Sequence, residues 1–311
     1  MIQAATATTS FWQQATQGEF TGVGDVTLPY VYFKQDNPKG TLVLCTGRCE
    51  TYLKYQELLE ELFQQGWNLF SWDHRGQGLA KRLVPGSHMG HVEDFNFYVD
   101  DMASFIDQIV TPQQVGKLFL VAHSMGGAIS TRYLQTRVHR VSAAVLSAPM
   151  YGITLPAPQW LLSPVVELLT RTHQWRGRAG YVPTGHDYVE DPFEGNPYSS
   201  SPERYEASLA LYRNQPELQL GEPSCQWLQQ SFKAMDALRH EVDQLQVPTL
   251  VLQGELEQVV CNRAMDRVCN LSAAITKEVI LGGRHELFIE DDPMRRKALE
   301  HTCQWLELHN Q

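Results

Sequence analysis

The stretch Leu118-Phe-Leu-Val-Ala122-His-Ser124-Met-Gly126-Gly-Ala-Ile129 combines an apolar strand, a sharp turn and the start of a helix. Ser124 is the centre of a small-x-Ser-x-small pentapeptide whose outer positions are Ala122 and Gly126. A serine on a strained strand-to-helix turn needs tiny side chains two positions before and after it, and alanine replaces the more usual glycine at the first. This context predicts that Ser124 is a nucleophile. The alternative is an ordinary tight turn between a strand and a helix.

The chain around this stretch alternates short apolar runs with longer segments of helical period. Such alternation is typical of an α/β fold with a mostly parallel central sheet and helices on both faces. The expected strands are Leu42–Cys45, Leu69–Trp72, Leu118–Ala122, Ala143–Leu146, Thr249–Leu252 and Val279–Leu281. The expected helices are Tyr52–Gln65, Phe95–Val110, Met125–Gln135, Asn262–Leu271 and Pro293–Leu308.

The alternation stops between residues 149 and 221, where proline, glycine and aromatic residues are frequent and no buried strand is evident. This segment lies between two expected strands of the sheet. We therefore expect a core made of residues 1–148 and 222–311, with residues 149–221 inserted as a helical cap, or lid, over one edge of the core. The length of 311 residues exceeds the usual size of a single hydrophobic core, which agrees with an inserted subdomain.

A serine hydroxyl attacks well only when a base takes its proton and a third group orients that base. With a nucleophile on this kind of turn, the acid and then the histidine follow it along the chain. His285 directly follows the last expected strand, in a Gly-Gly loop that can carry it over the serine. We therefore predict that His285 is the base. The histidines in less suitable positions are His74, His88, His91, His123 and His301.

The acid that orients His285 should lie just beyond the strand Thr249–Leu252. Two carboxylates follow that strand, Glu255 and Glu257. Glu257 occupies the acid position of a G-x-x-[D/E]-x-V-V pattern, so it is the favoured candidate. Glu255 is then a solvated loop charge.

Negative charge that develops on a substrate oxygen requires preorganised N–H donors. The backbone N–H of Met125 follows the nucleophile and supplies one donor. We expect the second from the loop after the strand Leu42–Cys45, at the backbone N–H of Arg48, with Gly47 allowing an unusual backbone there and lining the substrate site. The side chain of Arg48 is incidental to this role.

Several stretches together resemble the α/β-hydrolase superfamily, in its monoacylglycerol lipase-like branch, and most closely the bacterial lysophospholipases of the L-two type. The resemblance runs from about Thr41 to the C-terminus and is loose in the inserted segment. The stretches that carry it are Trp72-Asp-His-Arg-Gly76-Gln-Gly78, Gly90-His-Val, Phe95-Asn-Phe-Tyr98-Val-Asp100-Asp101, Ala122-His-Ser-Met-Gly-Gly-Ala-Ile-Ser130, Ala148-Pro-Met-Tyr-Gly152 and Gly282-Gly-Arg-His285-Glu.

Two departures refine this resemblance. Monoacylglycerol lipases usually show His-Gly-x-Gly-Glu at the oxyanion loop and aspartate as the acid, whereas this chain has Thr46-Gly-Arg-Cys-Glu50 and Glu257. Both features resemble the lysophospholipase group, so the resemblance implies lysolipids rather than neutral glycerides as substrates. It also implies that Asp73 is a structural residue and not the catalytic acid.

The inserted segment contains two further clues about the substrate. Trp160, Leu161 and Val165 belong to a broad apolar surface that either packs the cap on the core or forms a wall for one acyl chain or an interfacial patch. Arg176 belongs to a basic cluster, with Arg171 and Arg178, that is either a solvated loop or a contact for a phosphate headgroup or an anionic bilayer.

Composition excludes several functional classes. The net charge of −10 argues against bulk electrostatic binding of nucleic acid. The segment Met1–Ser10 has neither the cationic start nor the apolar stretch of a secretory signal, and six scattered cysteines form no disulfide framework. We therefore expect a cytoplasmic protein, either free or peripheral on the inner membrane.

These observations predict a serine esterase that needs no cofactor or metal and cleaves a lysophospholipid or another monoacyl ester. The alternatives within enzymes are a monoacylglycerol lipase and a short-chain carboxylesterase. An aminopeptidase is disfavoured, because no carboxylate cluster in the cap indicates a pocket for an amino terminus. The non-enzymatic alternative is a catalytically silent binding protein with a hydrolase fold.

Overall fold

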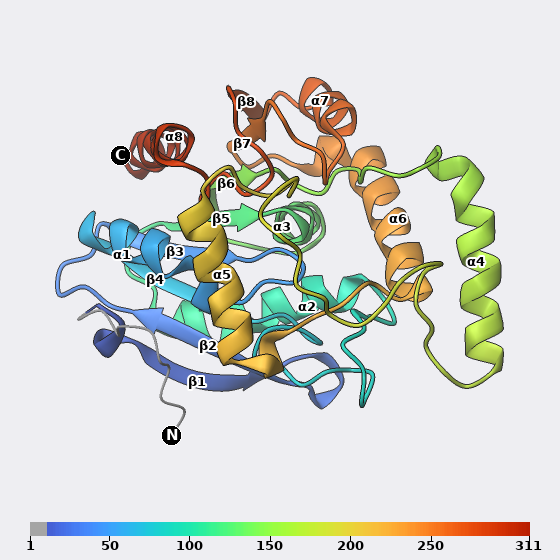
Figure 1. Ribbon diagram of the computed structural model, residues 1–311. Coiled ribbons are helices and arrows are strands. Elements are labelled where there is room, and N and C mark those ends of the chain that lie inside the picture. The colour runs from blue at the N-terminus through green and yellow to red at the C-terminus, as the bar shows by residue number, and fades with distance from the viewer. Residues whose placement is uncertain (1–10) are drawn as a thin grey trace.

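A computed structural model describes residues 11–311 and shows one eight-stranded sheet (Figure 1). The expectation drawn from Met1–Ser10 therefore lies outside the described residues. The strands run in the spatial order β1-β2-β4-β3-β5-β6-β7-β8. Their bounds are β1 Thr16–Thr21, β2 Thr27–Phe33, β3 Gly40–Cys45, β4 Trp67–Trp72, β5 Leu118–His123, β6 Val141–Ser147, β7 Thr249–Gly254 and β8 Ile275–Ile280.

The expected mostly parallel sheet is confirmed, since the six strands from β4 to β8 in this order are all parallel. The two antiparallel strands at the other edge, β1 and β2, are absent from the expectation. β1 is mostly exposed, so its sequence lacks an apolar run. β2 contains Pro29, which normally counts against a strand and is tolerated here close to the sheet edge. The strand expected at Val279–Leu281 begins earlier in the structure, because β8 spans Ile275–Ile280.

Helices cover both faces of the sheet (Figure 1). Their bounds are α1 Gln56–Gln64, α2 Asn96–Phe105, α3 Met125–Thr136, α4 Gln159–Trp175, α5 Pro202–Asn214, α6 Cys225–His240, α7 Asn262–Leu271 and α8 Asp292–Asn310. A short 3₁₀ helix, Tyr52–Tyr55, precedes α1, and a π-helical turn, Ile106–Val110, extends α2. All five expected helices are present, whereas α6 was not expected.

Alternation of side chains along the buried strands divides the core into two layers. Leu42, Leu44 and Val121 face one layer, to which α1 and α8 contribute. Val43 and Leu120 face the other layer, which contains residues of α2, α3, α6 and α7. Because every central strand is buried on both faces, its sequence shows a continuous apolar run rather than an alternation of apolar and polar residues.

Residues 149–221 form α4, α5 and irregular segments after β6 and contribute no strand to the sheet, and α6 follows them before β7. α4 packs against α6, whereas α5 lies apart from them, toward α1 (Figure 1). Tyr212 of α5 donates a hydrogen bond to the carbonyl oxygen of Cys49, 2.9 Å away, in the loop after β3. In the described part of the chain, no helix has the length and apolar character needed to cross a membrane.

Candidate active site

Ser124 lies on the turn between β5 and α3 in a strained backbone conformation. Its φ of 51° and ψ of −116° fall in a region that residues with a side chain rarely adopt. The turn also brings α3 against the end of β3: a Cβ atom at Gly126 would lie only 2.3 Å from the carbonyl oxygen of Cys45. Glycine is therefore required at position 126, two residues after Ser124, because the backbone at the end of β3 lies so close, as the sequence pattern predicts.

Three side chains from separate loops meet at this turn. Nε2 of His285 lies 3.0 Å from Oγ of Ser124, and Nδ1 of His285 lies 2.7 Å from Oε2 of Glu257. His285 comes from the loop after β8, and Glu257 from the loop after β7. The structure thus brings together the three residues selected from the sequence, in a geometry that allows a proton to pass from serine to imidazole.

Glu257 is held as a carboxylate by several donors. The backbone N–H groups of Val259 and Val260 donate to its Oε1 at 2.7 and 3.1 Å. Burial alone would raise the pKa of Glu257, but the hydrogen bond and charge of His285 and these backbone donors outweigh it and lower the pKa. Glu257 is therefore suited to orient and stabilise a protonated His285.

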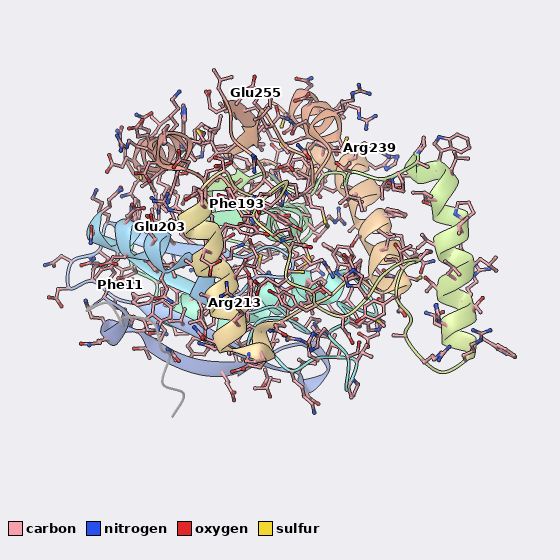
Figure 2. All side chains as sticks on the ribbon, viewed as in Figure 1. Phe11, Phe193, Glu203, Arg213, Arg239 and Glu255 are labelled. Carbon is pink, nitrogen blue, oxygen red and sulfur yellow. The ribbon has the colours of Figure 1, made fainter. Side chains whose placement is uncertain are left out.

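The other carboxylate weighed from the sequence, Glu255, lies elsewhere. It is exposed beside β8 (Figure 2), and its carboxylate accepts a hydrogen bond from the backbone N–H of Gly282, 2.9 Å away. This contact stabilises the turn that leads to His285 without touching the imidazole.

Of the two expected oxyanion donors, Met125 follows Ser124 directly in the chain and Arg48 lines the same cavity. Met125 is the first residue of α3, where backbone N–H groups have no acceptor within the helix. Arg48 lies in the loop after β3 and lines the same cavity as Ser124. Gln77 holds this loop through hydrogen bonds from its Nε2 to the carbonyl oxygens of Gly47, at 2.7 Å, and Glu50, at 3.1 Å.

The reason for glycine at position 47 differs from the expectation. Cys49, with φ of 62°, is the residue of this loop in the left-handed region, whereas Gly47 is not. Gly47 is needed for space, because a Cβ there would lie 2.8 Å from Oε2 of Glu50 and 3.0 Å from Nδ1 of His123. Gly47 is not among the residues that line the cavity, unlike its neighbour Arg48.

A buried ion pair supports both the oxyanion loop and His285. Nδ1 of His123 lies 3.1 and 3.2 Å from the two carboxylate oxygens of Glu50, which also accepts the backbone N–H of Gly47. Nε2 of His123 lies 3.2 Å from the carbonyl oxygen of His285. Burial disfavours the charged forms of both residues, but their mutual attraction outweighs it. The charges of His123 and Lys54 hold the pKa of Glu50 well below its usual range, and the Glu50 carboxylate raises the pKa of His123.

Ser124 opens into a cavity of about 350 Å³, within the size range of small-molecule sites. Met150, Ile153, Val259 and Val260 form an apolar part of its wall, joined by a β-bridge between Ile153 and Val260. Sequence reasoning missed most of the remaining wall. These residues are Cys49, Glu50, Lys54, His186, Asp187, Tyr188, Val189, Asp191, Tyr198, Tyr205, Ser208, Leu209, Tyr212, Leu220, Gly221, Glu222, Pro223, Trp227 and Glu286.

This wall corrects one expectation about the cap. Asp187 and Asp191 of the inserted segment line the cavity, and so does Glu222. The cavity wall therefore contains carboxylates from the cap that were not evident in the sequence, where their apparent absence argued against an aminopeptidase. The carboxylates could not be recognised as a group because the folding of the insertion, rather than a motif, places them around one cavity.

Four other residues selected from the sequence do not reach this cavity. Trp160, Leu161 and Val165 lie on exposed positions of α4, and Arg176 ends that helix at the surface. Since α4 packs on α6, these residues form no wall for an acyl chain beside Ser124. The side chains of Trp160, Leu161 and Val165 therefore pack neither on the core nor around the cavity, whereas Val166 of the same helix is buried in the core.

Asp73 has the structural position that the sequence resemblance implies. Its carboxylate accepts hydrogen bonds from the backbone N–H of Tyr52 at 2.9 Å and of Leu79 at 2.7 Å, and from the hydroxyl of Thr51 at 2.9 Å. Burial raises its pKa to about 7, against the effect of these donors. Asp73 joins two loops and does not contact His285.

Comparison with known proteins is consistent with this geometry. Residues 36–292 match the protein family Hydrolase_4, described as "Serine aminopeptidase, S33". The sequence is 38% identical over 309 residues to "Lysophospholipase L2" of Escherichia coli (strain K12), covering 97% of this chain and 90% of that protein. It is 31% identical over 304 residues to "Probable lysophospholipase L2" of Haemophilus influenzae, covering 96% of this chain and 95% of that protein.

The fold is similar to that of solved structures at lower sequence identity. The monoacylglycerol lipase of Paleococcus ferrophilus superposes with a TM-score of 0.72 at 21% identity, covering 91% of this chain and 99% of that one. At this identity the likeness concerns the fold alone.

Proposed function

Because the chain belongs to the Hydrolase_4 family of serine hydrolases, we propose that it cleaves the acyl ester of lysophospholipids, releasing a free fatty acid and a glycerophosphodiester. The observation that carries this proposal is the pair of hydrogen-bond contacts that link Ser124 to His285 and His285 to Glu257, beside a cavity. The choice of lysophospholipid is supported by 38% identity, over nearly the whole chain, to a protein named for that activity.

The reaction follows from the positions of the polar atoms. Oγ of Ser124 attacks the ester carbonyl while Nε2 of His285 takes its proton. The Glu257 carboxylate keeps the imidazole oriented through Nδ1 and stabilises its positive charge. The backbone N–H groups of Met125 and Arg48 stabilise the oxyanion.

Collapse of the tetrahedral intermediate completes the first half of the reaction. His285 returns its proton to the departing glycerol oxygen, which leaves the acyl group on Ser124. Water, activated by His285, then attacks the acyl-enzyme, and the fatty acid departs as Ser124 recovers its proton. The apolar wall formed by Met150, Ile153, Val259 and Val260 suits the acyl chain during both halves.

A second candidate function is that of an aminopeptidase. The observation that favours it is the set of carboxylates in the cavity wall, Asp187, Asp191 and Glu222, which could bind an amino terminus. The family description also names a serine aminopeptidase. A monoacylglycerol lipase uses the same acyl chemistry and differs only in the headgroup of its substrate.

A substrate panel tests these alternatives. Fatty-acid release is measured from lysophosphatidylethanolamine and monoolein, and chromophore release from p-nitrophenyl butyrate and leucine p-nitroanilide. We expect the highest kcat/KM with lysophosphatidylethanolamine. A higher value with monoolein would assign the protein to the glyceride lipases, and a higher value with the anilide would assign it to the aminopeptidases.

We further propose that α4 places the protein peripherally on the cytoplasmic face of an anionic membrane. Val166 and Thr170 bury one face of this helix, whereas the opposite face exposes 74% of Trp160, 66% of Leu168 and 86% of Trp175. Isolated exposed apolar residues are ordinary, but several large ones on one helix favour contact with lipid.

Basic residues at the end of α4 support the same membrane contact. Arg176 and Arg178 are exposed where the helix ends, and Arg171 is exposed one turn earlier, paired with Glu167. Each cation near an anionic surface contributes about 1 kcal/mol. A membrane contact on α4 would bring the enzyme to the source of a lysolipid substrate.

A further inference from the structure

The side chain of Arg48 is closely packed where it borders the cavity. Its guanidinium carbon lies 5.2 Å from the ring centroid of Trp227. On Gly90, a Cβ atom would lie only 2.8 Å from Nη2 and 3.2 Å from Nε of Arg48. The guanidinium is therefore held between an indole ring and a glycine, and any side chain at position 90 would displace it.

The surrounding backbone is also tied together. The N–H of Gly90 donates to the carbonyl oxygen of Glu222 at 3.1 Å, and the N–H of Gly221 donates to that of His88 at 2.7 Å. Nη2 of Arg48 donates to the carbonyl oxygen of Gly221. Three segments that are distant in sequence thus form one frame around the guanidinium.

The hydrogen-bonding capacity of Arg48 is incompletely used. In the described part of the chain its partners are neutral, namely the carbonyl of Gly221 and the thiol of Cys49, 3.1 Å from Nη1. Its Nε is buried and has no hydrogen-bond partner among the described residues. An arginine presents five N–H donors, and these partners use two of them, so the guanidinium retains capacity to donate to an anionic acceptor.

The other lysine or arginine of the cavity wall is already neutralised. Nζ of Lys54 lies 2.6 Å from Oε1 of Glu286 and 3.5 Å from Oε1 of Glu50. Arg48 is therefore the cation of this wall that remains available to a ligand. Planar guanidinium groups bind phosphate through parallel hydrogen bonds, which makes arginine well suited to this group.

We propose that the Arg48 guanidinium binds the phosphodiester of the substrate headgroup and so selects lysophospholipids over neutral monoacylglycerols. This inference rests on the proposed function and assigns a specificity to the same site. The backbone N–H of Arg48 faces the ester oxyanion in that function, while its side chain extends along the cavity wall. A lysolipid has the same arrangement, with a short glycerol unit between its ester carbonyl and its phosphate.

The carboxylates in the wall are compatible with this assignment. Asp187 and Glu222 form no ion pair with Arg48 in the described structure, and Asp187 accepts hydrogen bonds from Tyr181 and from the backbone N–H of His88. Their negative charge suits the ammonium group of a zwitterionic headgroup. Lysophosphatidylethanolamine is therefore the appropriate test substrate.

The first experiment compares Arg48→Gln with the control Lys297→Gln, which removes one positive charge from an exposed position on α8, outside the cavity. The readout is the ratio of kcat/KM for lysophosphatidylethanolamine to kcat/KM for monoolein. We expect Arg48→Gln to lower this ratio about 10- to 100-fold, because charged hydrogen bonds to phosphate are lost, and Lys297→Gln to preserve it. An unchanged ratio, or an equal loss on both substrates, would overturn the inference.

A second measurement uses the wild-type protein and does not depend on the folding of a variant. Glycerophosphoethanolamine, glycerol and inorganic phosphate are compared as inhibitors of p-nitrophenyl butyrate hydrolysis. The proposal predicts competitive inhibition by the phosphodiester alone. Equal inhibition by glycerol would exclude phosphate recognition, and equal inhibition by inorganic phosphate would indicate an anion site unrelated to the headgroup.

The failure of the inference is distinguishable from failure of the proposed function. A wild-type protein that hydrolyses monoolein but not lysophosphatidylethanolamine refutes the function itself. A wild-type protein active on lysophosphatidylethanolamine, whose substrate ratio is unaffected by Arg48→Gln, refutes only the role of Arg48.

Discussion

Nε2 of His123 lies 3.2 Å from the carbonyl oxygen of His285, so the imidazole that precedes Ser124 in the sequence supports the backbone of the residue that contacts Ser124 in space. The other ring nitrogen of His123 pairs with Glu50, whose carboxylate accepts the N–H of Gly47 in the oxyanion loop. One buried ion pair thus joins the oxyanion loop to the loop that carries His285, and the proposed reaction requires both loops to keep their positions beside Ser124.

Replacing Glu50 by glutamine should destabilise the protein by roughly 3 kcal/mol, because the protonated His123 loses its buried partner. The depressed pKa of Glu50 stabilises the fold above its ordinary value of 4.5, and the raised pKa of His123 stabilises it below 6.5. The difference between wild type and Glu50→Gln in free energy of unfolding should therefore be largest between pH 4.5 and 6.5.

Urea unfolding across this pH range provides the measurement. The difference should decline as pH rises through the raised folded pKa of His123, and also as pH falls through the folded pKa of Glu50. Glu300→Gln, at an exposed position of α8, is the control. A difference that is flat with pH, or that matches the control, would exclude the ion pair as a source of stability.

Alanine at position 257 should reduce kcat on p-nitrophenyl butyrate by roughly 10⁴-fold, because His285 loses the group that orients it. Alanine at position 255 should leave kcat within a few-fold of wild type, since the Glu255 carboxylate accepts the N–H of Gly282 rather than a hydrogen bond from His285. The two variants remove the same side chain two positions apart and so control for each other. The reverse ranking would show that Glu255 is the acid.

Alanine at position 126 should damage both stability and activity. Its Cβ would meet the carbonyl oxygens of Cys45 at 2.3 Å and Thr46 at 2.4 Å, so α3 or the oxyanion loop must move. Overpacking of this kind costs roughly 1–3 kcal/mol, and a displacement of about 1 Å can reduce turnover 10²-fold. Thermal unfolding and kcat measure the two effects; wild-type values for both would show that the elbow tolerates a larger residue.

Changing Arg171, Arg176 and Arg178 together to glutamine should weaken binding to vesicles that contain anionic lipid. Each charge near the surface contributes about 1 kcal/mol, so three should lower the partition coefficient by roughly 100-fold or more at low ionic strength. Vesicle co-sedimentation measures the change, and turnover of p-nitrophenyl butyrate serves as the control because that ester is dispersed in water. Binding equal to that of wild type would refute the membrane contact.

Local patterns explain why much of the fold and the reacting groups could be predicted. Buried parallel strands leave continuous apolar runs, and the residues around Ser124 carry a steric requirement that is visible in five consecutive positions. Glu257 and His285 could be selected because each follows a strand at the same edge of the sheet. β1 was missed because an exposed edge strand has no such run.

The cavity wall was not predictable in this way, because it depends on how the insertion packs. Trp160 and Leu161 indicate a wall for substrate when only the sequence is considered. In the fold, α4 packs another of its faces against α6 and leaves these two side chains exposed. The contact between Glu50 and His123 joins residues 73 positions apart and has no sequence signature. The role proposed for the Arg48 side chain likewise depends on Gly90 and Trp227, which the fold places against the guanidinium.

Peptide mapping after reaction with a fluorophosphonate probe tests the nucleophilic role of Ser124 most directly. We expect the adduct on Ser124 in the wild-type protein, much slower labelling in His285→Ala, and no adduct at this site in Ser124→Ala, whose kcat should fall on the order of 10⁶-fold. An adduct on another residue, or full turnover by Ser124→Ala, would contradict the account.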